Sequence, residues 1–197
     1  MTAKELLAAY ANGQRDFFQQ DLRGIDLSDA MLFQINLSGS NLSGANLHST
    51  NLSNANLDGI NLDGANLREA NLIGVSMIRA DLNKANLDYA QLAGAICYHS
   101  NFNKASLIKV DAVSADFSDC NFQYANLWKA NLENVNLNRA NLTNATLQDT
   151  NLTRSTLVEA ILRNIEFVRT NLTDCRMQNV SLNGSNLDKA ILKDTKW

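Results

Sequence analysis

A strict five-residue period runs through almost the whole chain. A large or small apolar residue stands at every fifth position from Leu22 to Leu192, which makes 35 consecutive units in 197 residues. We call this position the centre of its unit. Because every centre is apolar, we expect every centre to be buried. Leucine fills 27 centres, and the other eight are Phe102, Phe117, Phe122, Phe167, Met77, Met177, Cys97 and Ala112.

A period of five fits neither an α-helix nor a plain β-strand. Helical spacing would scatter the centres around all sides, whereas a chain that turns a corner every five residues keeps them all inside. Eight of the nine glycines and five asparagines stand two positions after a centre. Both residue types tolerate positive φ, so the pattern predicts a turn at that position.

The other positions of the unit are also restricted. Alanine stands two residues before the centre in 17 of the 35 units, which indicates a second inward position where space is tight. Between the two stands Asn in 18 units and Asp in five. Proline is absent, as expected of stacked coils whose backbone N–H groups bond to the next coil.

These units resemble a known repeat family. They match the motif A(D/N)LXX of the pentapeptide-repeat proteins over about nine tenths of the chain, and Ala45-Asn46-Leu47 is one such unit. The resemblance implies an all-β fold, a right-handed quadrilateral parallel β-helix (the Rfr fold) of about nine coils with four units per coil. The stretch from Leu6 to Phe17 is similar to the N-termini of cyanobacterial members.

The chain divides into a short cap and a long solenoid. Residues 1–19 are predicted to form a capping α-helix and its exit, because Thr2 and Glu5 make a capping box and Asn12-Gly13 can end a helix. Leu6, Leu7 and Tyr10 would form the apolar face of this helix over the first coil. Residues 20–197 are predicted to form the β-helix.

The core pattern is least regular near the middle of the chain. The small centres Cys97 and Ala112 lie close to three phenylalanine centres, which indicates volume compensation in a dense core. The stretch 91–114 departs most often from the consensus. Either the coil bulges there, or the stretch is shaped for a partner.

No arrangement of residues indicates catalysis. His48 and His99 occupy outward positions on different sides, and no catalytic, cofactor-binding or metal-binding set is predicted. Cys97 and Cys120 could form a redox pair, but both stand at inward positions where cysteine behaves as a small hydrophobe. The sequence therefore predicts a protein that is not an enzyme and has no cofactor.

Two places are candidates for contact with a partner protein. The first is a patch in which aromatic and basic residues fall on one side of successive coils, although scattered surface hydrophobes are the alternative. This patch consists of Tyr89, Ile108, Lys109, Trp128 and Lys129. The second is the C-terminal end with Leu192 and Trp197. There Trp197 either folds over the last coil as a lid or leaves a bare end for pairing, as in some relatives, so the protein is expected to be a monomer or a C-terminal dimer.

Charge and hydropathy narrow the class of partner. The net charge is only −3, and neither a clustered basic surface nor a long apolar run appears, so no nucleic-acid or membrane partner is expected. The first residues do not resemble a signal peptide, which favours a cytoplasmic location. The predicted function is a non-enzymatic structural or protein-interaction module with an unidentified protein partner. The alternative is a DNA mimic that contacts a type II topoisomerase, disfavoured because no side of the rod is consistently acidic.

Overall fold

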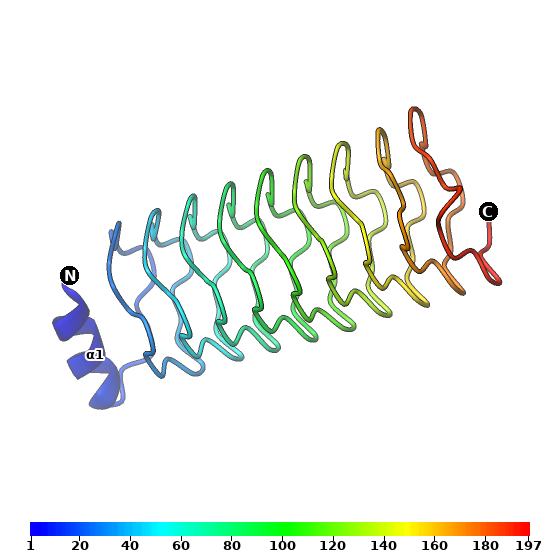
Figure 1. Cartoon of the computed structure of the whole chain (residues 1–197). Coiled ribbons are helices and arrows are strands. Elements are labelled where there is room, and N and C mark those ends of the chain that lie inside the picture. Colours follow the sequence, from blue (N-terminus) through cyan, green and yellow to red (C-terminus); the bar gives the residue numbers. More distant parts are fainter.

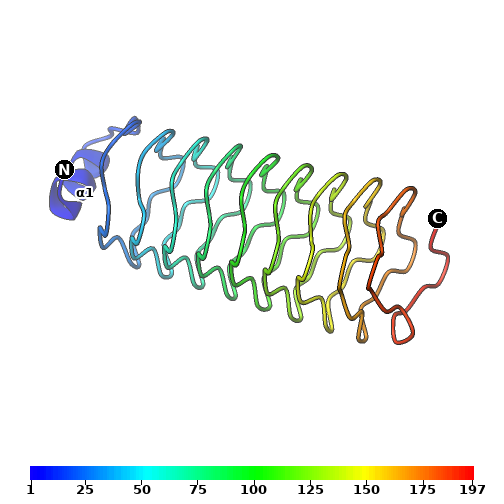
Figure 2. The ribbon, with the colours of Figure 1, turned by 90° about the horizontal axis from the view of Figure 1, so that it is seen from above.

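A computed structural model describes residues 1–197 as one helix followed by a solenoid. Helix α1 spans Ala3–Ala11 and lies at one end, and the coils follow in chain order to the C-terminus at the other end (Figure 1). The view from above shows the same elongated stack (Figure 2). None of the helical segments has the length and apolar character to cross a membrane.

Helix α1 begins with the predicted capping box. The Thr2 amide donates to Glu5 Oε2 at 2.8 Å, and the Glu5 amide donates to Thr2 Oγ1 at 3.3 Å. Leu6 is fully buried in the core, and the Tyr10 hydroxyl donates to the carbonyl of Phe33 at 2.9 Å. Leu7, expected on the buried face, is instead 38% exposed, so the helix covers the first coil along a narrower line than predicted.

The coils are joined by parallel bridges between residues 20 positions apart. The first bridge joins Asp16 to Asn36 and the last joins Arg176 to Lys196, which spans about nine coils with four bridges in each. Each unit contributes one bridging residue, the one before the centre, so no longer strand forms. Stacking begins at Asp16 rather than at residue 20, because Phe17 already occupies a centre position and is only 2% exposed.

Each unit repeats the same backbone hydrogen bonds. Around Leu42, the Leu42 amide donates to the Asn61 carbonyl at 2.7 Å, and the Gly44 amide donates to the Asp63 carbonyl at 2.8 Å. The Ala45 amide donates back to the Leu42 carbonyl at 3.0 Å and closes the turn. The next coil therefore satisfies most backbone groups that a five-residue corner leaves free.

The predicted turn position is confirmed. Residues two after the centre have positive φ at every unit from Gln19 to Gly184. Most are not glycine; Lys104, for example, has φ 58° and Tyr124 has φ 60°. An L-residue rarely holds this conformation unless its surroundings enforce it. Here the amide of the turn residue donates to the next coil, which fixes the turn while the side chain points outward.

Small polar residues at the inward position two before the centre make a second regular bond. Thr50 and Thr150 donate their hydroxyls to the carbonyls of Leu27 and Leu127, at 2.7 and 2.8 Å. These carbonyls lie 23 residues earlier, in the preceding coil. Buried hydroxyls are therefore satisfied, which explains why Ser and Thr alternate with Ala at a buried position.

The middle of the core supports volume compensation. The rings of Phe102 and Phe122 are stacked with centroids 4.7 Å apart, and Phe117 meets Phe122 edge-on at 5.3 Å. Ala112 is fully buried and lies half a coil along the chain from both Phe102 and Phe122. The phenylalanine rings occupy the space that a leucine centre fills in other coils.

The alternative that residues 91–114 bulge out of the coil is wrong. The bridges from Gln91 to Asp111 and from Ile96 to Asp116 are both in place. The unusual centres Cys97 and Ala112 are buried in the core, whereas Gln91, Ile96 and Asp111 are exposed and still form their bridges.

The ladder breaks elsewhere, between Thr146 and Glu166. No bridge joins these two residues, and neither the Leu147 amide nor the Glu166 amide makes a hydrogen bond to the facing coil. The Val168 amide turns to the carbonyl of Glu166 at 2.9 Å. In most units the residue before the centre is Asn, whose Oδ1 accepts the amide two residues on, as Asn151 does. The Glu166 side chain makes no such bond. Gln91 and Ile161 also lack it and keep their bridges, so at residue 166 the missing acceptor coincides with a turn in which the Val168 amide takes the Glu166 carbonyl.

We predict that Ala112→Leu destabilises the protein by about 1–3 kcal/mol, because the added carbons have no room beside the stacked phenylalanines. The double variant Phe102→Leu/Ala112→Leu should recover most of the loss, since it restores the core volume. Chemical denaturation of the three proteins measures both effects. An unchanged unfolding free energy in Ala112→Leu would contradict this account of the core.

We predict that Glu166→Asn closes the broken ladder and raises the melting temperature. Its Oδ1 can accept the Val168 amide, as Asn does in other units, and release the Glu166 carbonyl for Leu147. Hydrogen exchange should then show new protection at the amides of residues 147 and 166. Glu166→Gln, which removes the charge but keeps the longer side chain, is the control and should leave the ladder broken. Equal melting temperatures for Glu166→Asn and wild type would show that the side chain does not cause the break.

Candidate protein-interaction surfaces

The patch of Tyr89, Ile108, Lys109, Trp128 and Lys129, hereafter the Trp128 patch, lies on one side of three successive coils. Tyr89 is 43% exposed, and Lys109 Nζ lies 5.2 Å from the centre of its ring. Lys129 Nζ lies 4.5 Å from the Trp128 ring. The structure therefore places each lysine against an aromatic ring, an arrangement that restrains two otherwise flexible cations.

The charged pair of Asp149 and Arg169 holds the Trp128 side chain. Its Nε1 donates to Asp149 Oδ2 at 3.2 Å, and Arg169 binds the same carboxylate with two nitrogens at 2.5 and 2.8 Å. The hydrogen bonds from Arg169, with a smaller contribution from Trp128, lower the pKa of Asp149 to about 2. Asp149 is therefore ionised at neutral pH, and the half-buried indole keeps a fixed orientation on the surface.

Three residues beside this patch were missed by the sequence analysis. Lys84, Lys104 and Tyr124 occupy the turns that lead into the same side of the rod, and all three are exposed. The signal was present, because residues 84, 104 and 124 share one place in the 20-residue coil. Each turn joins two sides of the rod. Assigning every turn residue to both of these sides would have found these three residues.

Elsewhere the surface charges neutralise one another along the rod. Asp119 accepts two hydrogen bonds from Arg139 one coil later, at 2.7 and 2.6 Å, and these bonds lower the pKa of Asp119. All five ion pairs of the protein use arginine. His99 lies on the opposite side, edge-on to Tyr98 with ring centroids 5.5 Å apart. No cluster of three potential metal ligands is present.

The three cysteines are buried and free. The Cys120 thiol donates to the Cys97 carbonyl at 2.8 Å, and the Cys175 thiol donates to the Leu152 carbonyl at 2.8 Å. Burial raises the pKa of Cys120 to about 12 and that of Cys175 to about 11, and it also raises the pKa of Cys97. Few thiolates therefore form at neutral pH, and the thiols fill inward positions as small donors.

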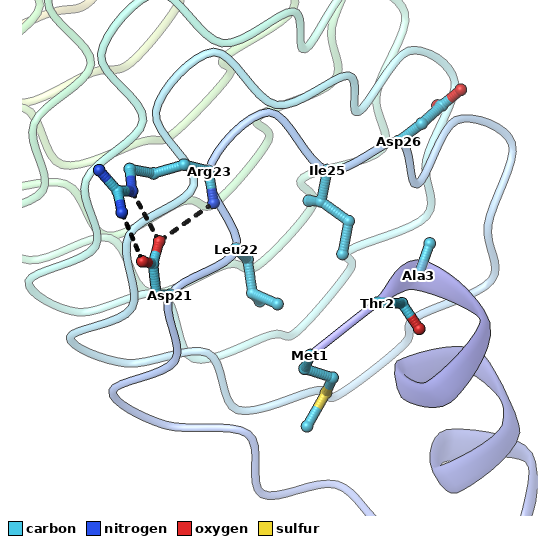
Figure 3. Close-up of a pocket in the computed structure, with 8 residues that line it drawn as sticks. All are labelled: Met1, Thr2, Ala3, Asp21, Leu22, Arg23, Ile25 and Asp26. Atoms are coloured by element: carbon cyan, nitrogen blue, oxygen red, sulfur yellow. Dashed lines mark hydrogen bonds and ion pairs between the residues drawn. The ribbon is translucent and has the colours of Figure 1, made fainter.

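A hollow of about 640 Å³ opens between the start of α1 and the first coil (Figure 3). Leu22 and Ile25 form its floor, and Arg23 pairs with Asp21 at 2.7 Å on the rim. The hydrogen bond from Arg23 lowers the pKa of Asp21, so these two charges satisfy each other. A second hollow of about 230 Å³ lies at the broken ladder, between Asn144 and Val168. Neither holds a set of converging titratable groups suited to acid–base catalysis.

At the C-terminal end, Leu192 is 38% exposed and Trp197 is 55% exposed. Just over half of the Trp197 surface is therefore open to solvent. The neighbouring Ile191 is 50% exposed as well, so the last described coil presents an apolar surface.

The repeat geometry agrees with a family model. The model of pentapeptide repeats matches in overlapping copies that together run from residue 21 to residue 196. The chain belongs to the pentapeptide-repeat family. No curated protein matches its sequence.

Solved structures of other pentapeptide-repeat proteins resemble this chain. HetL, involved in heterocyst differentiation regulation in the cyanobacterium Nostoc sp. strain PCC 7120, is 29% identical with a TM-score of 0.45, over 100% of this chain and 94% of HetL. A trypsin-treated variant of QnrB1, a plasmid-mediated fluoroquinolone resistance protein, is 20% identical with a TM-score of 0.57, over 92% and 86%. Rfr23 from the cyanobacterium Cyanothece 51142 is 20% identical with a TM-score of 0.28, over 99% of both chains. The likeness to QnrB1 shows a shared solenoid fold.

We predict that the native protein reacts very slowly with a thiol reagent at pH 8, because thiolate is scarce at the pKa values of Cys120 and Cys175 and all three sulfurs are covered. Unfolding in denaturant should release three reactive thiols. Spectrophotometric thiol titration measures both states. Rapid modification of the folded protein would contradict the buried placement.

Proposed function

We propose that this protein is a non-enzymatic interaction module that presents the Trp128 patch to a partner protein. The observation that carries the proposal is the fixed indole of Trp128 beside the exposed ring of Tyr89, with Lys109 and Lys129 against these two rings. Tryptophan, tyrosine and neighbouring cations are the residues that most often dominate binding energy at protein interfaces.

The rigidity of the rod supports this proposal. Arg169 and Asp149 hold Trp128, and Lys109 and Lys129 rest on aromatic rings, so little conformational freedom remains to be lost on binding. We also propose that the solenoid is a right-handed β-helix with a quadrilateral cross-section. We further propose that the protein is located in the cytoplasm. We propose that the module is a monomer or a dimer that forms through the C-terminal end with Leu192 and Trp197.

The DNA-mimic alternative has less support. Imitation of a phosphate backbone needs unpaired negative charges at regular spacing along one side. On this rod the carboxylates of Asp119 and Asp149 are each bound by an arginine one coil later. The side that carries the Trp128 patch is basic rather than acidic.

We predict that the immobilised wild-type protein captures a specific protein from a lysate of its source organism, and that Tyr89→Ala/Trp128→Ala does not, because the variant loses both aromatic anchors. Ile78→Ala/Tyr98→Ala, which removes apolar area from the opposite side, is the matched control and should retain the partner. Mass spectrometry identifies the captured protein, and thermal melts confirm folding. Equal capture by the wild type and the Trp128 patch variant would refute the proposal.

A further inference from the structure

We propose that the partner contacts this side through an acidic protein segment, whose carboxylates are held by Lys84, Lys104, Lys109 and Lys129. This inference rests on the proposed function and gives the chemistry of its partner. The lysines lie in three stacked segments, residues 84–89, 104–109 and 124–129, which form the same side of three successive coils.

The segments place cations along both edges of the side. Each begins in the turn that leads onto the side and ends in the turn that leads off it, with residues 84, 104 and 124 on one edge and residues 89, 109 and 129 on the other. Lys84 and Lys104 are therefore neighbours on the first edge, and Lys109 and Lys129 are neighbours on the second. Adjacent coils are about 4.8 Å apart, so each pair forms one local centre of positive charge.

These four cations are available to a partner. None of them takes part in an ion pair, although five arginines of the protein do. The only carboxylate on the three segments is Asp88, whose Oδ1 already accepts the Ser106 hydroxyl at 2.5 Å and the Ile108 amide at 3.0 Å. The three segments thus carry a net charge of +3 on a protein whose total is −3. Such a local reversal of sign attracts an acidic partner and orients it.

The aromatic rings favour an acidic protein segment over a nucleic acid. Single-stranded nucleic acid binds such surfaces by stacking bases on free aromatic faces. Here two of the three rings carry cations, since Arg68 and Lys109 both lie 5.2 Å from the Tyr89 ring centre and Lys129 Nζ lies 4.5 Å from the Trp128 ring. Only Tyr124, 56% exposed, has no cation against it, and one free ring does not make a row of stacking platforms. The half-buried Ile108 and Trp128 lie in the turns of the second edge, directly before Lys109 and Lys129, where they can contact apolar side chains next to the partner's carboxylates.

The test measures binding of a fluorescently labelled poly-glutamate peptide by anisotropy, at low and at physiological ionic strength. Lys84→Glu/Lys104→Glu should weaken binding about tenfold or more, because it reverses one edge of the site. Lys193→Glu/Lys196→Glu, with the same change in total charge on the last coil, should bind within about twofold of wild type. Added salt should weaken wild-type binding.

Three results would overturn the inference. These are no binding of poly-glutamate by wild type, equal losses in the two charge-reversal variants, and tighter binding of labelled single-stranded oligothymidine than of poly-glutamate. Lys84 and Lys104 lie outside the Trp128 patch, so the two proposals can fail separately. If Tyr89→Ala/Trp128→Ala loses the captured partner and Lys84→Glu/Lys104→Glu keeps it, the interaction module stands and its acidic partner does not.

Discussion

The hydrogen bond between backbone groups 20 residues apart is the interaction on which the rest of the structure depends. A five-residue unit that turns a corner cannot satisfy its own amides and carbonyls, and a single coil cannot bury its centres. Stacking solves both problems, because each coil bonds to the next while the centres merge into one core. The broken ladder at Glu166 shows the dependence locally, since the loss of one side-chain acceptor accompanies the loss of two backbone bonds.

The stacking of the coils also determines how side chains are arranged on the surface. Because the coil length is fixed, residues 20 apart lie above one another, and each side of the rod consists of straight columns of side chains. Ion pairs such as Asp149 with Arg169 form along a column, as do the hydrogen-bonded hydroxyls of the core. Columns also allow four lysines to gather on one side without any change to the backbone. Binding specificity can therefore arise from outward residues alone, while the inward residues keep the fold.

Much of this arrangement could be predicted from the sequence. The five-residue period predicted the buried centres and the turn position, because each follows from which residues can be inward or adopt positive φ. The coil of 20 residues followed from the resemblance to the pentapeptide-repeat family. The boundary at Phe17 was missed because the count began at the first leucine. The stretch 91–114 looked irregular, but its small and large centres compensate inside the core. The break at Glu166 could not be foreseen, since Gln91 and Ile161 replace the same Asn and keep their bridges. Lys84 and Lys104 were not included in the predicted patch because each lies in a turn that joins two sides of the rod.

The central claim is that the rod is a rigid scaffold recognised on one side. Photo-cross-linking from a benzoylphenylalanine placed at position 89 or at position 98 tests it most directly, because both positions hold a tyrosine, about half a coil apart on opposite sides of the rod. The account predicts a partner adduct from position 89 and none from position 98. Adducts of equal yield from both positions, or an adduct from position 98 alone, would contradict it.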